Sequence, residues 1–157
     1  MERMLDQLGQ FFGQDQTRQQ EYRDFERRYR EDPNSISDAE AARRYRELMA
    51  QMQDDDDYGD EEVFGRLSPQ ERRMMAERFR DATRDPRRPY QGYPEGMDLE
   101  EAAQPHNLGR MSRRAAREDG DLIEQLVGPD SPLNSTAAKL ALAGGAAYVA
   151  SRFFGRR

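Results

Sequence analysis

The sequence contains no cysteine and a single histidine, His106. The lack of cysteine excludes disulfide bridges, thiolate metal sites and cysteine nucleophiles in this chain. With one histidine it cannot build a multi-histidine metal site, and a Ser-His-Asp triad would have to include His106. His106 lies between Pro105 and Asn107, with no acid, serine or second ligand that the sequence places beside it. We therefore assign it no role, and we predict no catalytic residue, no metal ligand and no cofactor.

Large apolar residues are scarce as well. Tryptophan is absent, hydrophobic residues make up 35% of the chain, and charged residues make up 36%. Such a composition buries enough apolar surface to offset the entropy of ordering over only part of the 157 residues. No stretch alternates polar and apolar residues as a half-buried strand does. The sequence predicts an all-α protein with a small helical N-terminal unit, a flexible linker and an apolar C-terminal helix.

The N-terminal part carries apolar residues at helical spacing. We expect a short amphipathic helix within residues 1–17 and an antiparallel helical unit over residues 18–84. A serine followed three residues later by a glutamate, at Ser37 and again at Ser68, marks two helix starts in this unit. Prolines, glycines and tyrosines then interrupt the pattern over residues 85–98, which we interpret as an extended linker and a domain boundary.

An acidic loop at residues 54–62 holds seven acidic residues within nine positions. They are Asp54, Asp55, Asp56, Asp57, Asp60, Glu61 and Glu62. Because like charges repel each other and resist burial, we predict a solvated loop. The spacing resembles the start of an EF-hand, but Tyr58 would occupy the fifth position, and Gly65 the twelfth, where a bidentate glutamate is required. Diffuse attraction of divalent cations is the alternative to an ordinary charge run.

Residues 99–130 are expected to form short charged helices, one of which carries a row of four arginines. Arg110, Arg113, Arg114 and Arg117 have the spacing that gathers side chains on one side of a helix. Such a row suits anion contact, because arginine offers planar, bidentate donors to phosphate. The net charge of −6 argues against nucleic acid as the partner. Pairing with the acidic loop or an anionic lipid surface, and a solvated helix face, stay open as alternatives.

The C-terminal segment, residues 131–157, contrasts with the charged body. It has no acidic residue, and the twelve residues between Lys139 and Arg152 are uncharged. A helix of that length covers about 18 Å, less than a hydrocarbon layer of about 30 Å, so a membrane span is marginal. Small residues at four-residue spacing suit close helix packing. We predict a helix whose alternative roles are burial against the body, lateral membrane association and self-association.

Three helical blocks and one further segment of the chain resemble segments of other proteins. They are Tyr22-Arg-Asp-Phe-Glu-Arg-Arg-Tyr29, Ala42-Arg-Arg-Tyr45, Phe64-Gly-Arg-Leu-Ser-Pro-Gln-Glu-Arg72 and Ser131-Pro-Leu-Asn-Ser135. Through them the chain resembles uncharacterised bacterial helical proteins that share the Phe-x-x-Leu-Ser-Pro-Gln-Glu-Arg block and an apolar small-residue C-terminal segment. The resemblance covers residues 18–84 and 131–154. It carries no activity, ligand or catalytic residue, and residues 85–130 have no counterpart in it.

These features predict a non-enzymatic adaptor or accessory protein that attaches through its C-terminal helix to a membrane surface or a protein assembly. The expected contact residues are Leu140, Leu142, Tyr148, Val149, Phe153 and Phe154 for apolar contact, and Arg152, Arg156 and Arg157 for anionic groups. The alternatives are a self-assembling structural protein and, last, an enzyme with an unrecognised carboxylate site. The partners expected are another protein, a second copy of the chain or an anionic membrane surface. No N-terminal signal peptide is visible, so we expect a cytoplasmic location, with membrane association as an option.

Overall fold

The computed structural model describes residues 16–53, 58–127, 131 and 135–154. Its elements are α2 (Gln16–Glu31), the 3-10 turn η1 (Pro33–Ser35), α3 (Asp38–Met49), α4 (Asp60–Phe64), α5 (Pro69–Ala82), α6 (Leu99–Ala102), α7 (Pro105–Glu118), α8 (Gly120–Val127) and α9 (Ser135–Phe154). These ranges contain no strand, which confirms the all-α prediction. The helix expected within residues 1–17 lies outside the described part, except where α2 begins at Gln16.

Two helices begin at the serines that the sequence marks. Ser68 forms a complete capping box, because its Oγ accepts from the Glu71 amide at 3.1 Å while the Glu71 carboxylate accepts from the Ser68 amide at 2.9 Å. Ser37 Oγ also accepts from the Glu40 amide at 3.1 Å. The Glu40 carboxylate instead accepts two hydrogen bonds from the Arg28 guanidinium, at 2.9 and 2.6 Å. Glu40 therefore ties α3 to α2.

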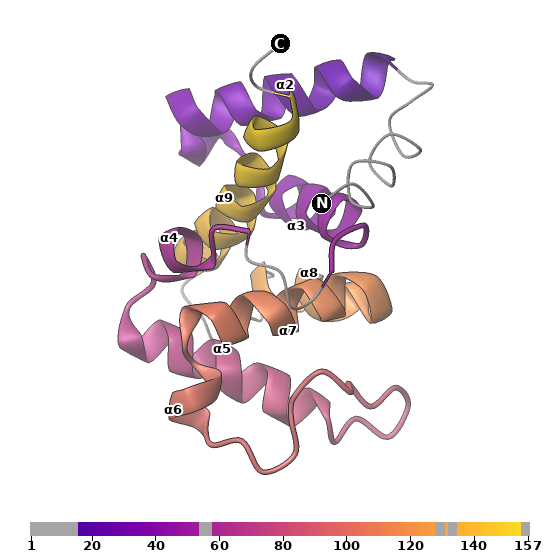
Figure 1. Ribbon diagram of the computed structural model, residues 1–157, viewed down its shortest axis with the longest axis vertical. Coiled ribbons are helices and arrows are strands. Elements are labelled where there is room, and N and C mark those ends of the chain that lie inside the picture. The colour runs from indigo at the N-terminus through magenta and orange to yellow at the C-terminus, as the bar shows by residue number, and fades with distance from the viewer. Residues whose placement is uncertain (1–15, 54–57, 128–130, 132–134, 155–157) are drawn as a thin grey trace.

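The C-terminal helix α9 runs through the middle of the molecule, with α2 across one end and α3 alongside (Figure 1). A Cβ atom on Gly144 would lie 2.8 Å from the Tyr29 hydroxyl, and one on Gly145 would lie 3.0 Å from the Tyr45 ring. The small-residue face of α9 is thus used for close packing within this chain. Of the alternatives for residues 136–154, burial against the body holds for one side of the helix, whose described side chains belong to the core. None of the helices in the described ranges is long and apolar enough to cross a membrane.

Residues 85–98 form no helix, as their prolines and glycines predict, but Tyr90, Tyr93 and Met97 of this segment pack into or against the core. Tyr90 is buried, its hydroxyl donates to the Met111 carbonyl oxygen at 2.7 Å, and its ring centroid lies 5.5 Å from that of Phe79. Helices before and after this segment contribute to one hydrophobic cluster. In place of the expected flexible linker and domain boundary, the structure has a packed connection, because Tyr90 fills the space between α5 and α7.

Candidate functional site

A buried ion pair joins α4 to α7. The Asp60 side chain is 2% exposed and the Arg113 side chain 1%, and the two make a bidentate contact, with Nη1 to Oδ1 at 2.7 Å and Nη2 to Oδ2 at 3.1 Å. The prediction of a solvated loop is therefore wrong for Asp60, because a guanidinium group compensates its charge inside the core. Glu61 and Glu62 are exposed, as predicted. The remaining acids of the run, residues 54–57, lie outside the described part.

His106 adds a second contact to the same carboxylate. Its Nδ1 lies 3.2 Å from Asp60 Oδ2, while 49% of its side chain is exposed. Gly109 allows the close approach, since a Cβ atom there would lie 2.2 Å from Asp60 Oδ1. His106, Gly109 and Arg113 follow each other along one side of α7 and together surround Asp60. The sequence assigns no role to His106 because its partner lies 46 residues earlier in the chain.

Two tyrosines complete the surroundings of the pair. The Arg113 guanidinium carbon lies 5.1 Å from the centroid of the Tyr58 ring, which is within reach of a cation–π contact. Burial raises the pKa of the Tyr45 hydroxyl, and the positive charge of Arg113 opposes part of that rise. Burial is the largest single influence on the pKa of Arg113 and acts to lower it, but the hydrogen bonds to Asp60, together with the charge interactions with Tyr45, Asp60 and Tyr58, hold that pKa above the ordinary value. Arg113 is therefore protonated inside the core.

The chemistry of this cluster is that of a structural connection. Both carboxylate oxygens of Asp60 accept hydrogen bonds from Arg113, so the carboxylate is already compensated. Bidentate geometry fixes the angle between the two groups as well as their distance. Within the described ranges, no group of three or more histidine, aspartate or glutamate side chains could hold a metal ion. The pair thus sets the position of α4 relative to α7.

The structure separates the four arginines that the sequence places in one row. All of them, Arg110, Arg113, Arg114 and Arg117, lie on α7. The Arg113 side chain points into the core. Arg114 Nε donates to Glu118 at 3.1 Å on the helix surface, and Arg117 Nη1 donates to the Met52 carbonyl oxygen at 3.4 Å. Of the alternatives left open, pairing with the acidic loop holds for Arg113 and Asp60. The row does not offer four guanidinium groups to a phosphate.

The contact residues predicted on α9 fall into two sets. Leu142 and Val149 are fully buried and belong to the core, so they are not available to a membrane or a partner in this fold. Leu140 and Tyr148 are partly exposed, and Arg152 is exposed. The side chains of Phe153 and Phe154, and residues Arg156 and Arg157, lie outside the described part. Of the predicted contact residues that the structure describes, Leu140, Tyr148 and Arg152 are the ones at the surface, where the predicted attachment requires them.

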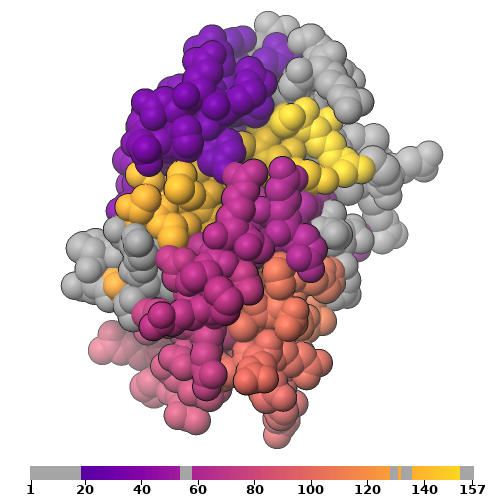
Figure 2. All heavy atoms as spheres, turned by 90° about the vertical axis from the view of Figure 1, so that its left-hand side faces the viewer, coloured from indigo at the N-terminus to yellow at the C-terminus, as the bar shows by residue number. Residues whose placement is uncertain are grey.

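Several side chains of α9 reach the surface, and residues of α2 and of the turn after α4 lie close to this helix. We call this group the α9 edge, and its residues are Tyr29, Arg66, Leu140, Tyr148 and Arg152. Arg152 Nη1 donates to the Tyr148 hydroxyl at 3.2 Å, and Arg66 Nη1 donates to the Tyr29 hydroxyl at 3.3 Å. Figure 2 shows α9 at the surface on both sides of the magenta segment that contains α4. Tyrosine and arginine are the residue types enriched in protein interfaces.

A backbone feature holds Tyr148 in this surface. Gly59, directly before Asp60, has a φ of 78°, a left-handed conformation that glycine adopts without strain. A Cβ atom on Gly59 would lie 2.8 Å from the Tyr148 ring, so only glycine leaves room for the aromatic side chain. The same short segment therefore supports the α9 edge through Gly59 and contacts α7 through Asp60.

Asp60 and His106 are the site residues that sequence reasoning missed. One local signal was present, since Val63 and Phe64 follow Asp60 at three- and four-residue spacing and mark the buried side of α4. Comparisons with protein-family models, curated proteins and solved structures found no match for this chain. Function is therefore inferred from the geometry of the chain itself.

Proposed function

We propose that this protein is a non-enzymatic adaptor that attaches to an anionic membrane surface through the α9 edge and the basic residues that follow it. The observation that carries the proposal is the two-sided placement of α9. Leu142 and Val149 anchor the helix in the core, while Leu140, Tyr148 and Arg152 stay at the surface. An attachment made at this edge holds the whole helical body in a defined orientation.

The α9 edge combines the kinds of side chain that suit the surface of an anionic bilayer. Tyr29 and Tyr148 pair an apolar ring with a hydroxyl group, which suits the level of the lipid headgroups. Arg66 and Arg152 carry positive charge beside the rings, although Glu62, at 3.7 Å, compensates part of the charge of Arg66. A basic residue near an anionic surface contributes about 1 kcal/mol. Leu140 adds apolar contact. Together these residues support shallow, salt-dependent attachment.

The distribution of charge along the chain supports the same orientation. The chain has a net charge of −6, but residues 131–157 contain four basic residues and no acidic one. An anionic surface repels the acidic body and attracts this segment. The α9 edge is therefore the side of the molecule that we expect to face the membrane.

The alternative function, self-assembly through the small-residue face of α9, has less support. Tyr29 and Tyr45 already occupy the space above Gly144 and Gly145 within the chain. A dimer built on this face of α9 would have to displace both rings from their packing. Attachment at the α9 edge requires no such rearrangement.

Co-flotation of the full chain with vesicles tests the proposal. We expect flotation with phosphatidylcholine vesicles that contain phosphatidylserine and none with pure phosphatidylcholine. Arg152→Gln removes one charge from the α9 edge, so we expect about fivefold weaker binding, as the loss of about 1 kcal/mol implies. Arg27→Gln is the matched control, because Arg27 is an exposed arginine of α2 outside the α9 edge. It should float as the unaltered chain does.

Two outcomes contradict the proposal: no flotation with the anionic vesicles, or equal losses for Arg152→Gln and Arg27→Gln. Sedimentation equilibrium on the same samples then shows whether the chain self-associates instead. Deletion of residues 131–157 is unsuitable for this test, because it removes Leu142 and Val149 from the core and destabilises the body. Point variants leave α9 in place.

A further inference from the structure

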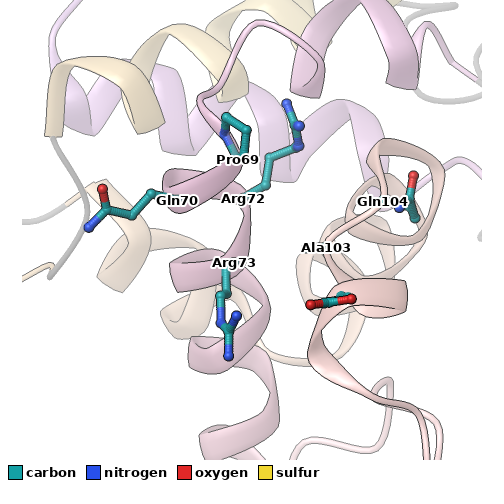
Figure 3. Close-up of a pocket in the computed structure, with 7 residues that line it drawn as sticks. Pro69, Gln70, Arg72, Arg73, Ala103 and Gln104 are labelled. Atoms are coloured by element: carbon teal, nitrogen blue, oxygen red, sulfur yellow. The ribbon is translucent and has the colours of Figure 1, made fainter.

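A hollow of about 460 Å³ opens between the first turns of α5 and the junction of α6 with α7 (Figure 3). We call it the α5–α6 hollow, and its lining residues are Pro69, Gln70, Arg72, Arg73, Glu100, Ala103 and Gln104. Its volume falls within the range of about 300–1,000 Å³ that is usual for small-molecule sites. No residue of the α9 edge lines it. An inference about this hollow is therefore independent of the proposed membrane attachment.

The two arginines of the α5–α6 hollow differ in what they already bind. Arg72 Nη1 donates to the carbonyl oxygen of Leu67 at 2.6 Å and to that of Gly65 at 3.4 Å, so it is held against the loop before α5. Arg73 is 55% exposed, and its nearest acid, Glu77, lies 3.7 Å away, beyond hydrogen-bond distance. In Figure 3 the two side chains extend from α5 in opposite directions. The two guanidinium groups therefore do not converge on one point. Binding of a single phosphate by both arginines would require such convergence.

The α6 side of the hollow supplies groups of a different kind. Glu100 is exposed, and within the described ranges no basic side chain forms an ion pair with it. Gln104 is the N-cap residue of α7, but its side chain makes no capping hydrogen bond, which leaves the amide for a ligand. Figure 3 shows Gln70 pointing away from Gln104. The polar groups placed to meet a ligand are thus the guanidinium of Arg73, the carboxylate of Glu100 and the amide of Gln104.

We propose that the α5–α6 hollow binds a zwitterionic ligand of the amino acid or short-peptide class. The ligand carboxylate pairs with Arg73, its ammonium group pairs with Glu100, and Gln104 binds a backbone amide. Arg72 is held by backbone carbonyl oxygens, and the remaining charged groups of the lining, Arg73 and Glu100, match a ligand that carries both charges. A phosphate or a nucleic acid would instead meet Glu100 as a like charge. Pro69 and Ala103 offer apolar contact to the side chains of the ligand.

Titration of the 15N-labelled full chain with alanyl-alanine tests this inference. We expect saturable shifts of the Ala103 and Gln104 backbone amides, with a dissociation constant of about 1 mM. N-acetyl-alanyl-alanine lacks the ammonium group and alanyl-alanine amide lacks the carboxylate. Each loses one exposed ion pair, so each should bind about fivefold more weakly. Free alanine distinguishes an amino acid site, where it binds as tightly as the dipeptide, from a peptide site, where it binds more weakly.

Two variants assign the two charges to their partners. Arg73→Gln should weaken binding of alanyl-alanine and of the acetylated probe by about fivefold, but not binding of the amide, which has no carboxylate to lose. Glu100→Gln should show the reverse selectivity, because it weakens the two probes that carry an ammonium group. Arg27→Gln is the matched control, since Arg27 is also 55% exposed and forms an ion pair with one acid of its own helix, Asp24, at 3.3 Å. It should leave all three affinities unchanged.

Three results overturn the inference. The first is the absence of shifts at Ala103 and Gln104 up to about 10 mM alanyl-alanine. The second is equal binding of the dipeptide and its two blocked forms, which shows that neither charge is recognised. The third is a stronger response of the same amides to inorganic phosphate, which identifies an anion site. None of these results changes the outcome of the vesicle experiment, so the two proposals succeed or fail separately.

Discussion

The helices α7 and α9 both contribute apolar side chains to the core, but α7 also buries a charged one. α7 is rich in arginine, and it buries Arg113 against Asp60. α9 is almost uncharged, yet it leaves Leu140 partly exposed while Leu142, two residues later, is fully buried. Burial in this protein therefore depends on the partner that the fold supplies to a side chain, and hydropathy alone does not decide it.

The two helices also differ in how specific their burial is. Arg113 requires one partner at one position, because an uncompensated charge in the core costs several kcal/mol. Leu142 and Val149 of α9 accept any well-packed apolar surroundings, since dispersion and the hydrophobic effect have no direction. We expect the charged contact of α7 to respond to substitution more sharply than the apolar contacts of α9.

The largest effect is expected from Asp60→Ala, which removes the carboxylate that accepts two hydrogen bonds from the buried Arg113. The free energy of unfolding should fall by about 3–5 kcal/mol, as is typical when one member of a buried ion pair is removed. Urea denaturation followed by circular dichroism measures this change. Glu62→Ala is the control, because Glu62 is 64% exposed and lies 3.7 Å from Arg66. It should change stability by less than about 1 kcal/mol, and similar losses for both variants would disprove the special role of Asp60.

A pair of substitutions within α9 compares its two sides directly. Leu142→Ala creates a cavity in the core, so we expect a loss of about 2–5 kcal/mol. Leu140→Ala removes a partly exposed side chain of the same size and should cost less than about 1 kcal/mol. Thermal or urea unfolding of the two variants gives the difference. Equal costs would mean that both sides of α9 are buried, which would contradict the exposed edge.

The smallest effect concerns the partly exposed pair of Arg28 and Glu40, which contrasts with the buried pair of Asp60 and Arg113. Hydrogen bonds from Arg28 lower the pKa of Glu40 below its ordinary value of 4.5, although partial burial acts in the opposite direction. A carboxyl group whose pKa is lowered in the folded state contributes stability above the ordinary pKa, and this contribution disappears as the pH falls through the lowered value. Because Arg28 is 38% exposed, the contribution should stay below about 1 kcal/mol.

Unfolding of the unaltered chain and of Glu40→Gln between about pH 7 and about pH 3 measures this contribution. The difference between the two chains should be constant near neutral pH and should shrink below pH 4.5, the ordinary pKa. A difference that does not change with pH would show that the pair contributes nothing through ionisation. In that case, of these two ion pairs, only the buried pair of Asp60 and Arg113 would stabilise the fold through its charges.

Local sequence patterns predicted much of the helical framework. The serines at positions 37 and 68 mark the starts of α3 and α5 because capping needs only residues within one turn. The uncharged C-terminal run predicted α9, and the prolines and glycines of residues 85–98 predicted a segment without helix. Each of these features depends on neighbours in sequence, which is why single-sequence reasoning found them.

The candidate sites were predicted less completely. The contacts of Asp60 with His106 and Arg113 span 46 and 53 residues, and no local pattern indicates such partners. The predicted domain boundary at residues 85–98 differs from the structure because Tyr90 is buried by α5 and α7 together, and no local pattern indicates contacts with two such distant helices. On α9 the sequence identified the surface residue Leu140 but also selected Leu142, since both look alike until the packing partners are known.

By itself the sequence determined that this chain is helical, where several helices begin, and that its C-terminal segment differs in charge from the body. These properties follow from hydrogen bonds, apolar spacing and charge within short stretches of chain. The tertiary structure alone decided which acid enters the core, which side of α9 faces solvent, and where the α5–α6 hollow opens. Those properties arise where distant segments meet, and there the cost of burying a group depends on the particular group opposite.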